Sequence, residues 1–316
     1  MKNLTKAETT AFLAEHDRFA IITHCGPDGD TVGSSAGLCL GLRQLGKTAH
    51  VLQNSQVPEK YQYLLDGLTK PDAEDGDTLV TVDVATPTMI SEDSVHLLEK
   101  IDLRIDHHSS DTPFAKKEYV DRTAAACSEI VWELLQPLGV KMEAPLANAL
   151  FTAVSTDTGC FRYANTSARS FALASACTAA SLDIFRITQA LFDTVTLGRL
   201  RLQSWVVEHM HLLCNGQIAV CGVPANIQEL LDLTDEDMGN LSGFLRSIDG
   251  VKIAATVRQD NEGHTGISVR AVPGYDAAAI CEKFGGGGHK GAAGAGMVNV
   301  TLDEAVNALI AAMPEI

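Results

Sequence analysis

Three side chains that can bind metal ions lie within seven residues near the start of the chain: His24, Asp28 and Asp30. They follow the apolar run 19–22, which is typical of a buried strand. The sequence Gly-Pro-Asp-Gly between them cannot continue a strand, because proline fixes φ and has no N–H, while glycine accepts turn conformations. The two carboxylates alternate around one glycine, so both can face one pocket that suits two adjacent cations. Taken alone, the stretch is equally compatible with a solvated turn.

Acidic residues recur at the ends of three further segments. Asp83 and the triplet Asp106-His107-His108 follow short apolar runs typical of strands, whereas Asp157 comes at the end of a helical pattern. In an open α/β sheet, ligands bind outside the carboxyl ends of the strands. We therefore expect these side chains to gather at one edge of a sheet. The alternative for the triplet, a helix N-cap with two surface histidines, is weakened by the presence of the other acids.

A set of carboxylates and imidazoles of this kind suits the hydrolysis of phosphate esters. That reaction needs a nucleophilic water and a stabilised leaving oxyanion, and two cations about 3.5–4 Å apart can serve both ends of the displacement. Mixed oxygen and nitrogen donors fit Mn²⁺ better than Mg²⁺, and a set without thiolate argues against structural zinc. We therefore predict two divalent ions, with Mn²⁺ as the first choice and Mg²⁺ or Co²⁺ as alternatives.

A second unusual stretch, residues 285–294, contains four consecutive glycines followed by His289 and Lys290. Glycine lets the backbone approach a ligand and turn its N–H groups toward an anion, and the two side chains add a donor and a positive charge. We interpret the stretch as a phosphate-binding loop; the alternative is a flexible linker. It is neither a Walker A loop nor a dinucleotide fingerprint, because the required spacing and the preceding strand are missing.

Composition limits the partners and the compartment. The net charge of −16 disfavours sequence-independent binding to long nucleic acid, which needs a basic track. The sequence shows no apolar stretch long enough to cross a membrane and no signal peptide at its start, and its eight cysteines are scattered without a Cys-x-x-Cys pair. These features predict a cytoplasmic protein with reduced thiols.

The order of predicted elements favours two domains. Strands that alternate with helical patterns up to about residue 185 indicate crossover connections and an α/β fold with a doubly wound, mainly parallel sheet. Residues 186–214 read as a helical linker without strand signal. Residues 215–316 read as a second, smaller α/β domain with a mixed sheet. In it we expect strands at 217–223, 251–257, 266–272 and 297–300, and helices near 235–248, 276–284 and 302–313.

The motif set resembles the DHH/DHHA1 family of phosphoesterases, and within it the short two-domain type that acts as an oligoribonuclease and as a phosphatase of adenosine 3′,5′-bisphosphate. Each motif alone is weak, but five occur in the family's order over nearly the whole chain. The matching stretches are His24 to Ser34, Val82-Asp83, Asp106-His107-His108, Ser155 to Gly159 and Gly285 to Gly294.

The resemblance implies a two-metal hydrolase, usually dependent on manganese. It implies two sets of ligands that share a bridging carboxylate: His24, Asp28 and Asp83 for one cation, and Asp30, Asp83, His107 and Asp157 for the other. It further implies that Asp106 orients the neighbouring imidazoles and that His108 contacts the scissile phosphate.

The same resemblance implies residues of the second domain that hold the terminal phosphate or the nucleotide of the substrate. These are Arg270 and the glycine-rich residues Gly286, Gly287, Gly288, His289 and Lys290.

The expected activity is the hydrolysis of short oligoribonucleotides to 5′-mononucleotides, and of adenosine 3′,5′-bisphosphate to AMP. One alternative is a phosphodiesterase for linear or cyclic dinucleotide signals such as pApA. Another is a nucleotide-binding module without activity, which would predict a broken ligand set, whereas every expected ligand is present. The expected partners are short oligonucleotides or small nucleotides, with no long duplex and no membrane, and the chain could form a homodimer.

Overall fold

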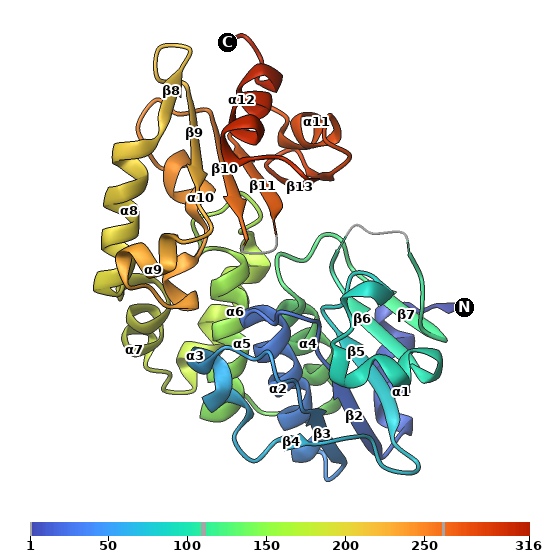
Figure 1. Cartoon of the computed structure of the whole chain (residues 1–316). Coiled ribbons are helices and arrows are strands. Elements are labelled where there is room, and N and C mark those ends of the chain that lie inside the picture. Colours follow the sequence, from blue (N-terminus) through green and yellow to red (C-terminus); the bar gives the residue numbers. More distant parts are fainter. Residues whose placement is uncertain (1, 109–111, 261–262) are drawn as a thin grey trace. The chain divides into compact units, whose positions relative to one another are not determined.

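The computed structural model describes residues 2–108, 112–260 and 263–316 (Figure 1). The chain divides into two compact units, Met1–Thr194 and Val195–Ile316. The segment 186–214, expected as a linker, is divided between them: its part up to Thr194 belongs to the first unit and the rest to the second. Within the described ranges, no helix has both the length and the apolar character that a bilayer span requires.

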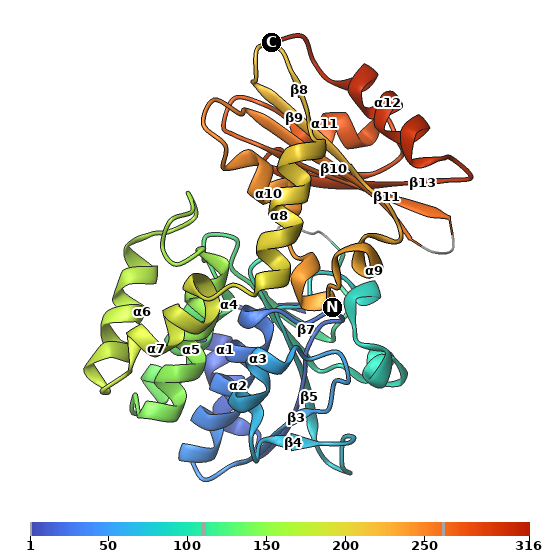
Figure 2. The same cartoon turned by 60° about the vertical axis from the view of Figure 1, so that its left-hand side comes forward.

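A seven-stranded sheet forms the centre of the first unit, in the order β1-β7-β6-β5-β2-β3-β4 (Figures 1 and 2). All of its strand pairs are parallel, so the carboxyl ends of its strands lie at one edge. The predicted parallel α/β fold is therefore confirmed. The strands are β1 (Lys2–Asn3), β2 (Arg18–Ile22), β3 (Thr48–Leu52), β4 (Thr69–Lys70), β5 (Thr78–Val82), β6 (Leu103–Asp106) and β7 (Lys117–Val120).

Helices follow most of these strands, as crossover connections require. The α-helices are α1 (Lys6–Glu15), α2 (Gly29–Gln44), α3 (Glu59–Gln62), α4 (Cys127–Leu135), α5 (Ala144–Asp157), α6 (Ala168–Ala179) and α7 (Ile184–Thr188). Tighter 3₁₀ turns form η1 (Tyr63–Leu65), η2 (Pro87–Met89), η3 (Glu92–Lys100) and η4 (Gln136–Leu138), and η5 (Gln189–Asp193) is a π-helical turn.

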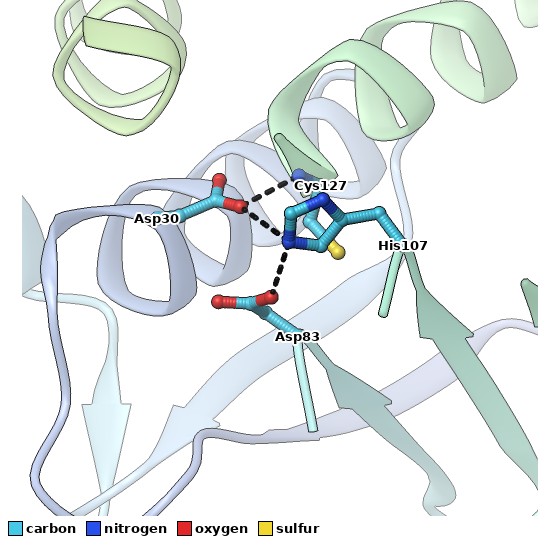
Figure 3. A group of neighbouring side chains, drawn as sticks. All are labelled: Asp30, Asp83, His107 and Cys127. Atoms are coloured by element: carbon cyan, nitrogen blue, oxygen red, sulfur yellow. Dashed lines mark hydrogen bonds and ion pairs between the residues drawn. The ribbon is translucent and has the colours of Figure 1, made fainter. Parts of the chain in front are cut away.

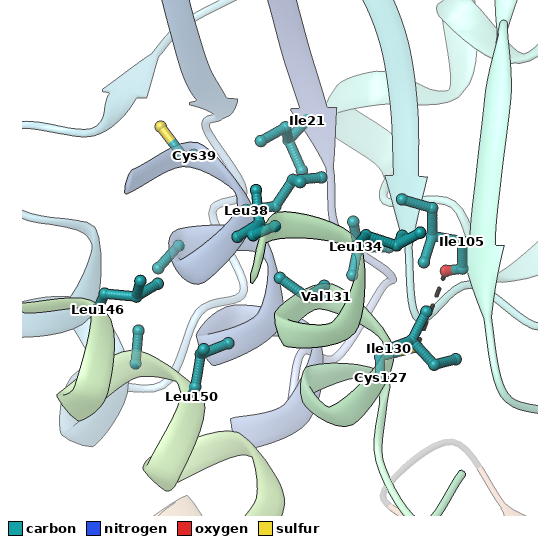
Figure 4. Packing of buried hydrophobic residues seen from close by; sticks show 14 of the residues in the cluster. Ile21, Leu38, Cys39, Ile105, Cys127, Ile130, Val131, Leu134, Leu146 and Leu150 are labelled. Carbon is teal, nitrogen blue, oxygen red and sulfur yellow. Dashed lines mark hydrogen bonds between the residues drawn. The ribbon is translucent and has the colours of Figure 1, made fainter. Parts of the chain in front are cut away.

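The two faces of this sheet enter different hydrophobic clusters, because successive side chains of a strand point to opposite sides. Ile21 and Ile105 pack with α1, α2, α4 and α5 in the main core (Figure 4). Ala20 and Ile22 pack on the other side, with Leu97 of η3. The central strands are buried on both faces, which explains their nearly continuous apolar sequences.

The second unit is built on a six-stranded mixed sheet, in the order β12-β13-β11-β10-β9-β8. Only β9 and β10 pair in parallel. The strands are β8 (His211–Leu213), β9 (Ile218–Val223), β10 (Ile253–Gln259), β11 (His264–Ala271), β12 (Gly287–His289) and β13 (Ala292–Val298). The helices are α8 (Leu197–His209), α9 (Ile227–Leu231), η6 (Asp235–Met238), α10 (Leu241–Arg246), α11 (Ala277–Glu282) and α12 (Leu302–Ala312).

Successive side chains of a strand again point to opposite faces of the sheet, so the core of this unit consists of two hydrophobic clusters. Ile218 and Val220 of β9 pack with α11 and α12, whereas Ala219 and Cys221 pack with α8, α9 and α10. The second, mixed-sheet α/β domain predicted from the sequence is therefore confirmed.

Several local predictions for the second unit are wrong. The strand expected at 297–300 runs from Ala292 to Val298, and the glycine-rich stretch before it contains the edge strand β12, which pairs with β13. The helix expected over 235–248 is interrupted, since η6 ends at Met238 and α10 begins at Leu241. The segment expected to lack strands ends in β8.

Candidate metal centre

His24 lies just beyond the end of β2, in the turn that leads to α2. Its Nδ1 hydrogen-bonds the carbonyl oxygen of Cys25 at 2.7 Å, so its Nε2 faces the carboxylates. That Nε2 lies 3.6 Å from Asp28 Oδ1 and 3.8 Å from Asp83 Oδ2. Burial opposes protonation of the ring, but the contacts with Asp28 and with the Cys25 carbonyl raise the pKa of His24 to about 9. A backbone bond of this kind is the usual way to orient a ligating imidazole.

Asp28 and Asp30 are placed by the start of α2. Asp28 is the N-cap, and its carboxylate accepts hydrogen bonds from two N–H groups of the first turn. Asp30 is completely buried, and it accepts bonds from the backbone nitrogen of Cys127 at 2.6 Å and from Ser34 Oγ at 2.7 Å. Burial and the charge of Asp83 raise the pKa of Asp30 to about 7.

Asp83 occupies the centre of the group. It directly follows β5, is only 2% exposed, and has a φ of 63°, which is unusual for a residue other than glycine. Its Oδ1 lies 3.3 Å from Nε2 of His107 and 3.5 Å from Nδ1 of His108. In the part of the chain that the structure describes, neither Asp83 Oδ1 nor His107 Nε2 has a hydrogen-bond partner. Buried polar atoms are normally hydrogen-bonded, so these two atoms, which make only ion-pair contacts, leave bonding capacity for a ligand.

The triplet at the end of β6 is organised by its aspartate. Asp106 Oδ1 accepts hydrogen bonds from Nδ1 of His108 and from the backbone nitrogen of His107, both at 2.8 Å. Its other oxygen pairs with the buried guanidinium of Arg104. Although burial opposes ionisation, His108 and Arg104 lower the pKa of Asp106 to about 2. Asp106 therefore remains a carboxylate, and its hydrogen bonds hold both neighbouring histidines.

The second ring nitrogen of His107 has a different role. Its Nδ1 bonds the carbonyl oxygen of Ala124 at 3.2 Å, so Nε2 points at the acids. Burial opposes the charge, but the contact with Asp83 and the charge of Asp30 raise the pKa of His107 to about 11. The ring thus carries a positive charge that partly compensates the carboxylates.

Asp157 reaches the group from the end of α5, as the sequence predicts. Its Oδ2 lies 3.4 Å from His107 Nε2, and its side chain is 26% exposed. Burial and the charges of Asp30 and Asp83 raise the pKa of Asp157 to about 9. Asn165 fixes the backbone here by donating to the carbonyl oxygen of Asp157 at 3.0 Å.

The structure brings the six predicted metal ligands together at the carboxyl edge of the first unit's sheet, in a chain of contacts through Asp83 and His107: His24, Asp28, Asp30, Asp83, His107 and Asp157. Among the described residues, three overlapping groups have ligand atoms within 4.8 Å of one another, and Asp83 belongs to all three. They are Asp30, Asp83, His107 and Cys127 (Figure 3); His24, Asp28 and Asp83; and Asp83, Asp106 and His108. The donor types and the unpaired buried atoms fit divalent cations.

Two members of this site were missed by the sequence analysis. Arg104 donates to the carbonyl oxygens of Val84 and Ala85 at 2.9 Å, as well as to Asp106, so it fixes the loop after β5 and the end of β6 together. A lone arginine within an apolar strand pattern could have indicated from the sequence that Arg104 has a buried partner. Cys127 gave no signal, because only the fold carries it to Asp30. The structure thus places a thiol beside a ligand set that was expected to contain no sulfur.

The predicted substrate-binding residues lie in the second unit. Arg270 on β11 and His289 on β12 both stand opposite Ala292 of β13, so they share one face of the sheet. Gly286 and Gly288 have a packing role as well, since a Cβ at either would overlap the backbone of β13. Gly287 and Lys290 are exposed. The stretch, interpreted from the sequence as a phosphate-binding loop, thus contains an edge strand paired with β13.

The fold and the site together describe an α/β protein. Buried acids and imidazoles at the carboxyl edge of its parallel sheet form a candidate two-cation centre. The model of the DHH family, N-terminal domain, matches residues 18–156, and that of the DHHA1 domain matches residues 218–316. The chain belongs to the DHH/DHHA1 family.

Similar proteins extend over nearly the whole chain. The bifunctional oligoribonuclease and PAP phosphatase NrnA of Thermus thermophilus is 31% identical over 300 residues, which are 93% of this chain and 89% of that protein. The cyclic-di-AMP phosphodiesterase GdpP of Geobacillus thermodenitrificans is 27% identical over 93% of this chain, but over only 46% of its own length. The crystal structure of an exopolyphosphatase-related protein from Bacteroides fragilis shares the fold, with a TM-score of 0.84, 24% identity and coverage of 97% and 94% of the two chains.

Proposed function

We propose that this protein hydrolyses short oligoribonucleotides to 5′-mononucleotides, and adenosine 3′,5′-bisphosphate to AMP. The observation that carries the proposal is the convergence of buried carboxylates on Asp83, whose Oδ1 lacks a hydrogen-bond partner among the described residues. The similarity to the Thermus thermophilus protein over most of both chains supports this substrate class.

We further propose that Mn²⁺ occupies two positions. His24, Asp28 and Asp83 would hold one ion, and Asp30, Asp83, His107 and Asp157 the other. When bound, the two ions supply an activated water and neutralise charge on the phosphate. The mixture of carboxylates and imidazoles supports Mn²⁺ over Mg²⁺, which prefers oxygen ligands and retained waters.

Residues of the chain itself would contact the phosphate, orient the imidazoles and bind the substrate. His108 is held by Asp106, is about one-third exposed and faces the cluster, so it is available to contact the scissile phosphate. Asp106 and the Ala124 carbonyl keep the two imidazoles in place. In the second unit, Arg270, Gly286, Gly287, Gly288, His289 and Lys290 would bind the terminal phosphate or nucleotide. The shared sheet face of Arg270 and His289 supports this assignment.

A second candidate function is hydrolysis of linear or cyclic dinucleotides such as pApA. The similarity to the GdpP protein, which is named for cyclic-di-AMP, favours it. The two functions are distinguished by competition between dinucleotides and longer oligonucleotides, measured with one protein preparation. The substrate with the higher kcat/KM identifies the preferred function.

The proposed setting is the cytoplasm, with short nucleic acids and nucleotides as partners and a homodimer as the assembly. All eight cysteines are free thiols, which supports a reducing compartment. The net charge of −16 supports short substrates over long duplexes. Light scattering on the purified protein measures the assembly.

The test uses labelled di- to pentaribonucleotides and adenosine 3′,5′-bisphosphate with added Mn²⁺. We expect hydrolysis of both substrates, and a loss of at least about 100-fold in kcat/KM in the Asp83→Ala variant. Mutation of the groups that support metal ligands typically costs ~10–100-fold in metal affinity or activity, and Asp83 itself faces both proposed ligand sets. Asp17→Ala is the matched control, since Asp17 is 90% exposed and precedes β2 at the opposite edge of the sheet. An inactive wild-type protein with every substrate would reject the proposed function.

A further inference from the structure

The first unit places a thiol beside its group of acids. Cys127 is the first residue of α4, and its Sγ belongs to a set in which the ligand atoms of Asp30, Asp83, His107 and Cys127 all lie within 4.8 Å of one another (Figure 3). The residue is completely buried. Its thiol has one weak contact, 3.8 Å from the carbonyl oxygen of Ile105. The sulfur is therefore not committed to a strong hydrogen bond.

The cysteine is held at this point by its own backbone. Its N–H donates to Asp30 Oδ2 at 2.6 Å, and the N–H of Ser128 donates to the other oxygen at 3.3 Å. The start of α4 and the Asp30 carboxylate are thereby fixed to each other. Displacement of this backbone away from the acids would break two hydrogen bonds to a buried carboxylate.

A second observation points to a ligand at the same place. Asp83 Oδ1 and His107 Nε2 lack hydrogen-bond partners among the described residues, although Asp83 is 98% buried and the two atoms are only 3.3 Å apart. A cation between them would meet one oxygen from each aspartate, one imidazole nitrogen and one sulfur.

We propose that Cys127 makes this group a binding site for thiophilic divalent cations such as Zn²⁺ and Cd²⁺, which compete there with the hard cation of the proposed function. Tetrahedral coordination by sulfur, nitrogen and carboxylate oxygen is the set that zinc prefers. Bonds of ~2.0–2.3 Å place such ligand atoms about 3.3–3.8 Å apart. His107 Nε2 already lies 3.3 Å from Asp83 Oδ1 and 3.8 Å from Asp30 Oδ2, and the remaining donors, all within 4.8 Å, need to approach by at most about 1 to 1.5 Å. The thiol binds as thiolate, and its proton passes to solvent.

The consequence rests on the proposed function: a cation held by Cys127 would occupy the position assigned to one Mn²⁺ and inhibit hydrolysis. Soft thiolate ligands select zinc-like ions, whereas carboxylates suit manganese. The cysteine would thus make the enzyme sensitive to the ratio of the two metals.

The chain offers a matched control. Cys39 on α2 is also completely buried, and burial raises the pKa of its thiol to about 11. It belongs to none of the three groups of metal-competent side chains found among the described residues. A Cys39→Ser variant therefore removes a buried thiol without touching the group.

The experiment titrates the full-length, metal-free protein with Cd²⁺ and Co²⁺ and records the ultraviolet sulfur-to-metal charge-transfer absorption. We expect the band in the wild type and in Cys39→Ser, and its loss in Cys127→Ser and Cys127→Ala. Zn²⁺ affinity by calorimetry should fall at least about tenfold in both Cys127 variants, while Mn²⁺ affinity changes less than about threefold.

A band that persists in both Cys127 variants, or that the wild type never shows, overturns the proposal. Two variants are used, with circular dichroism on each, so that a folding defect in one does not decide the result. The spectroscopic result does not depend on turnover. A protein that shows the band but hydrolyses no nucleotide would refute the proposed function and leave the thiophilic site standing.

Discussion

At the scale of single residues, the centre is a group of acids that repel one another in the absence of a cation. Burial and mutual repulsion raise the pKa of Asp30 to about 7 and that of Asp157 to about 9. The neighbouring His107 has its pKa raised to about 11 by the same acids, against the effect of burial. Between roughly pH 4 and pH 9, these three groups therefore bind more protons in the folded metal-free protein than in the unfolded chain.

This difference predicts how pH governs cation binding. Because these three groups hold more protons in the folded state than in the unfolded chain, their contribution to the stability of the metal-free protein falls as pH rises from about 4 toward 9. A cation replaces these protons and removes the repulsion, so its stabilising effect grows with pH. We expect Mn²⁺ to raise the melting temperature more at about pH 8 than at about pH 6, as measured by calorimetry. Asp157→Asn should reduce this dependence, and a melting shift that is equal or larger at the lower pH would contradict the argument.

The convergence of these side chains could be predicted from the sequence, because each proposed ligand lies next to a local signal. His24, Asp83 and Asp106 follow apolar strands, and the carboxyl edge of a parallel sheet brings such positions together. Arg104 and Cys127 were missed for a physical reason. Their roles depend on contacts with Asp106 and Asp30 that only the folded chain makes. The arginine is unusual within its apolar strand, but the sequence does not show which groups it contacts, and nothing in the sequence points to Cys127.

At the scale of elements, the distance between α2 and α5 determines the geometry of the site. α2 carries Asp28 and Asp30 at its start, and α5 carries Asp157 at its end. The two helices approach closely at Gly33, where an added Cβ would overlap the carbonyl oxygen of Ala149. A backbone atom cannot rotate away as a side chain can, so the helices themselves would have to separate.

Gly33→Ala should therefore weaken both the fold and the metal centre. We expect a loss of about 1–3 kcal/mol in the free energy of unfolding, the usual cost of overpacking. We also expect weaker Mn²⁺ binding, because Asp157 moves away from Asp30. Ser35→Ala on the same helix is the control: its buried hydroxyl has no partner among the described residues, so its removal should be neutral or slightly stabilising. Urea unfolding and calorimetry measure both effects, and unchanged Mn²⁺ binding in Gly33→Ala would disprove the coupling.

Short or irregular elements explain most of the wrong predictions. β1 and β4 contain two residues each, which is too few for an alternating pattern to appear in the sequence. The glycine-rich stretch resembles a loop because glycine is rare in strands, yet Gly286 and Gly288 are needed there for close contact with β13. In such cases tertiary packing, not local preference, decides the conformation.

At the scale of the whole molecule, each unit has its own hydrophobic clusters. Those of the first unit join its parallel sheet to the helices between Lys6 and Thr188, and those of the second unit lie between Leu202 and Met313. The proposed cation ligands all belong to the first unit. Folding and cation binding should therefore be separable from the nucleotide recognition proposed for the second unit.

Division of the chain after Thr194 tests this separation. We expect fragment 1–194 to unfold cooperatively and to be stabilised by Mn²⁺, because its core and all six proposed ligands are intact. Fragment 195–316 should also fold, without any Mn²⁺ effect, since it contains none of those ligands. Thermal unfolding followed by circular dichroism, with and without Mn²⁺, distinguishes the outcomes. A melting shift in fragment 195–316, or its absence in a folded fragment 1–194, would show that residues beyond the proposed six determine how the cations are held.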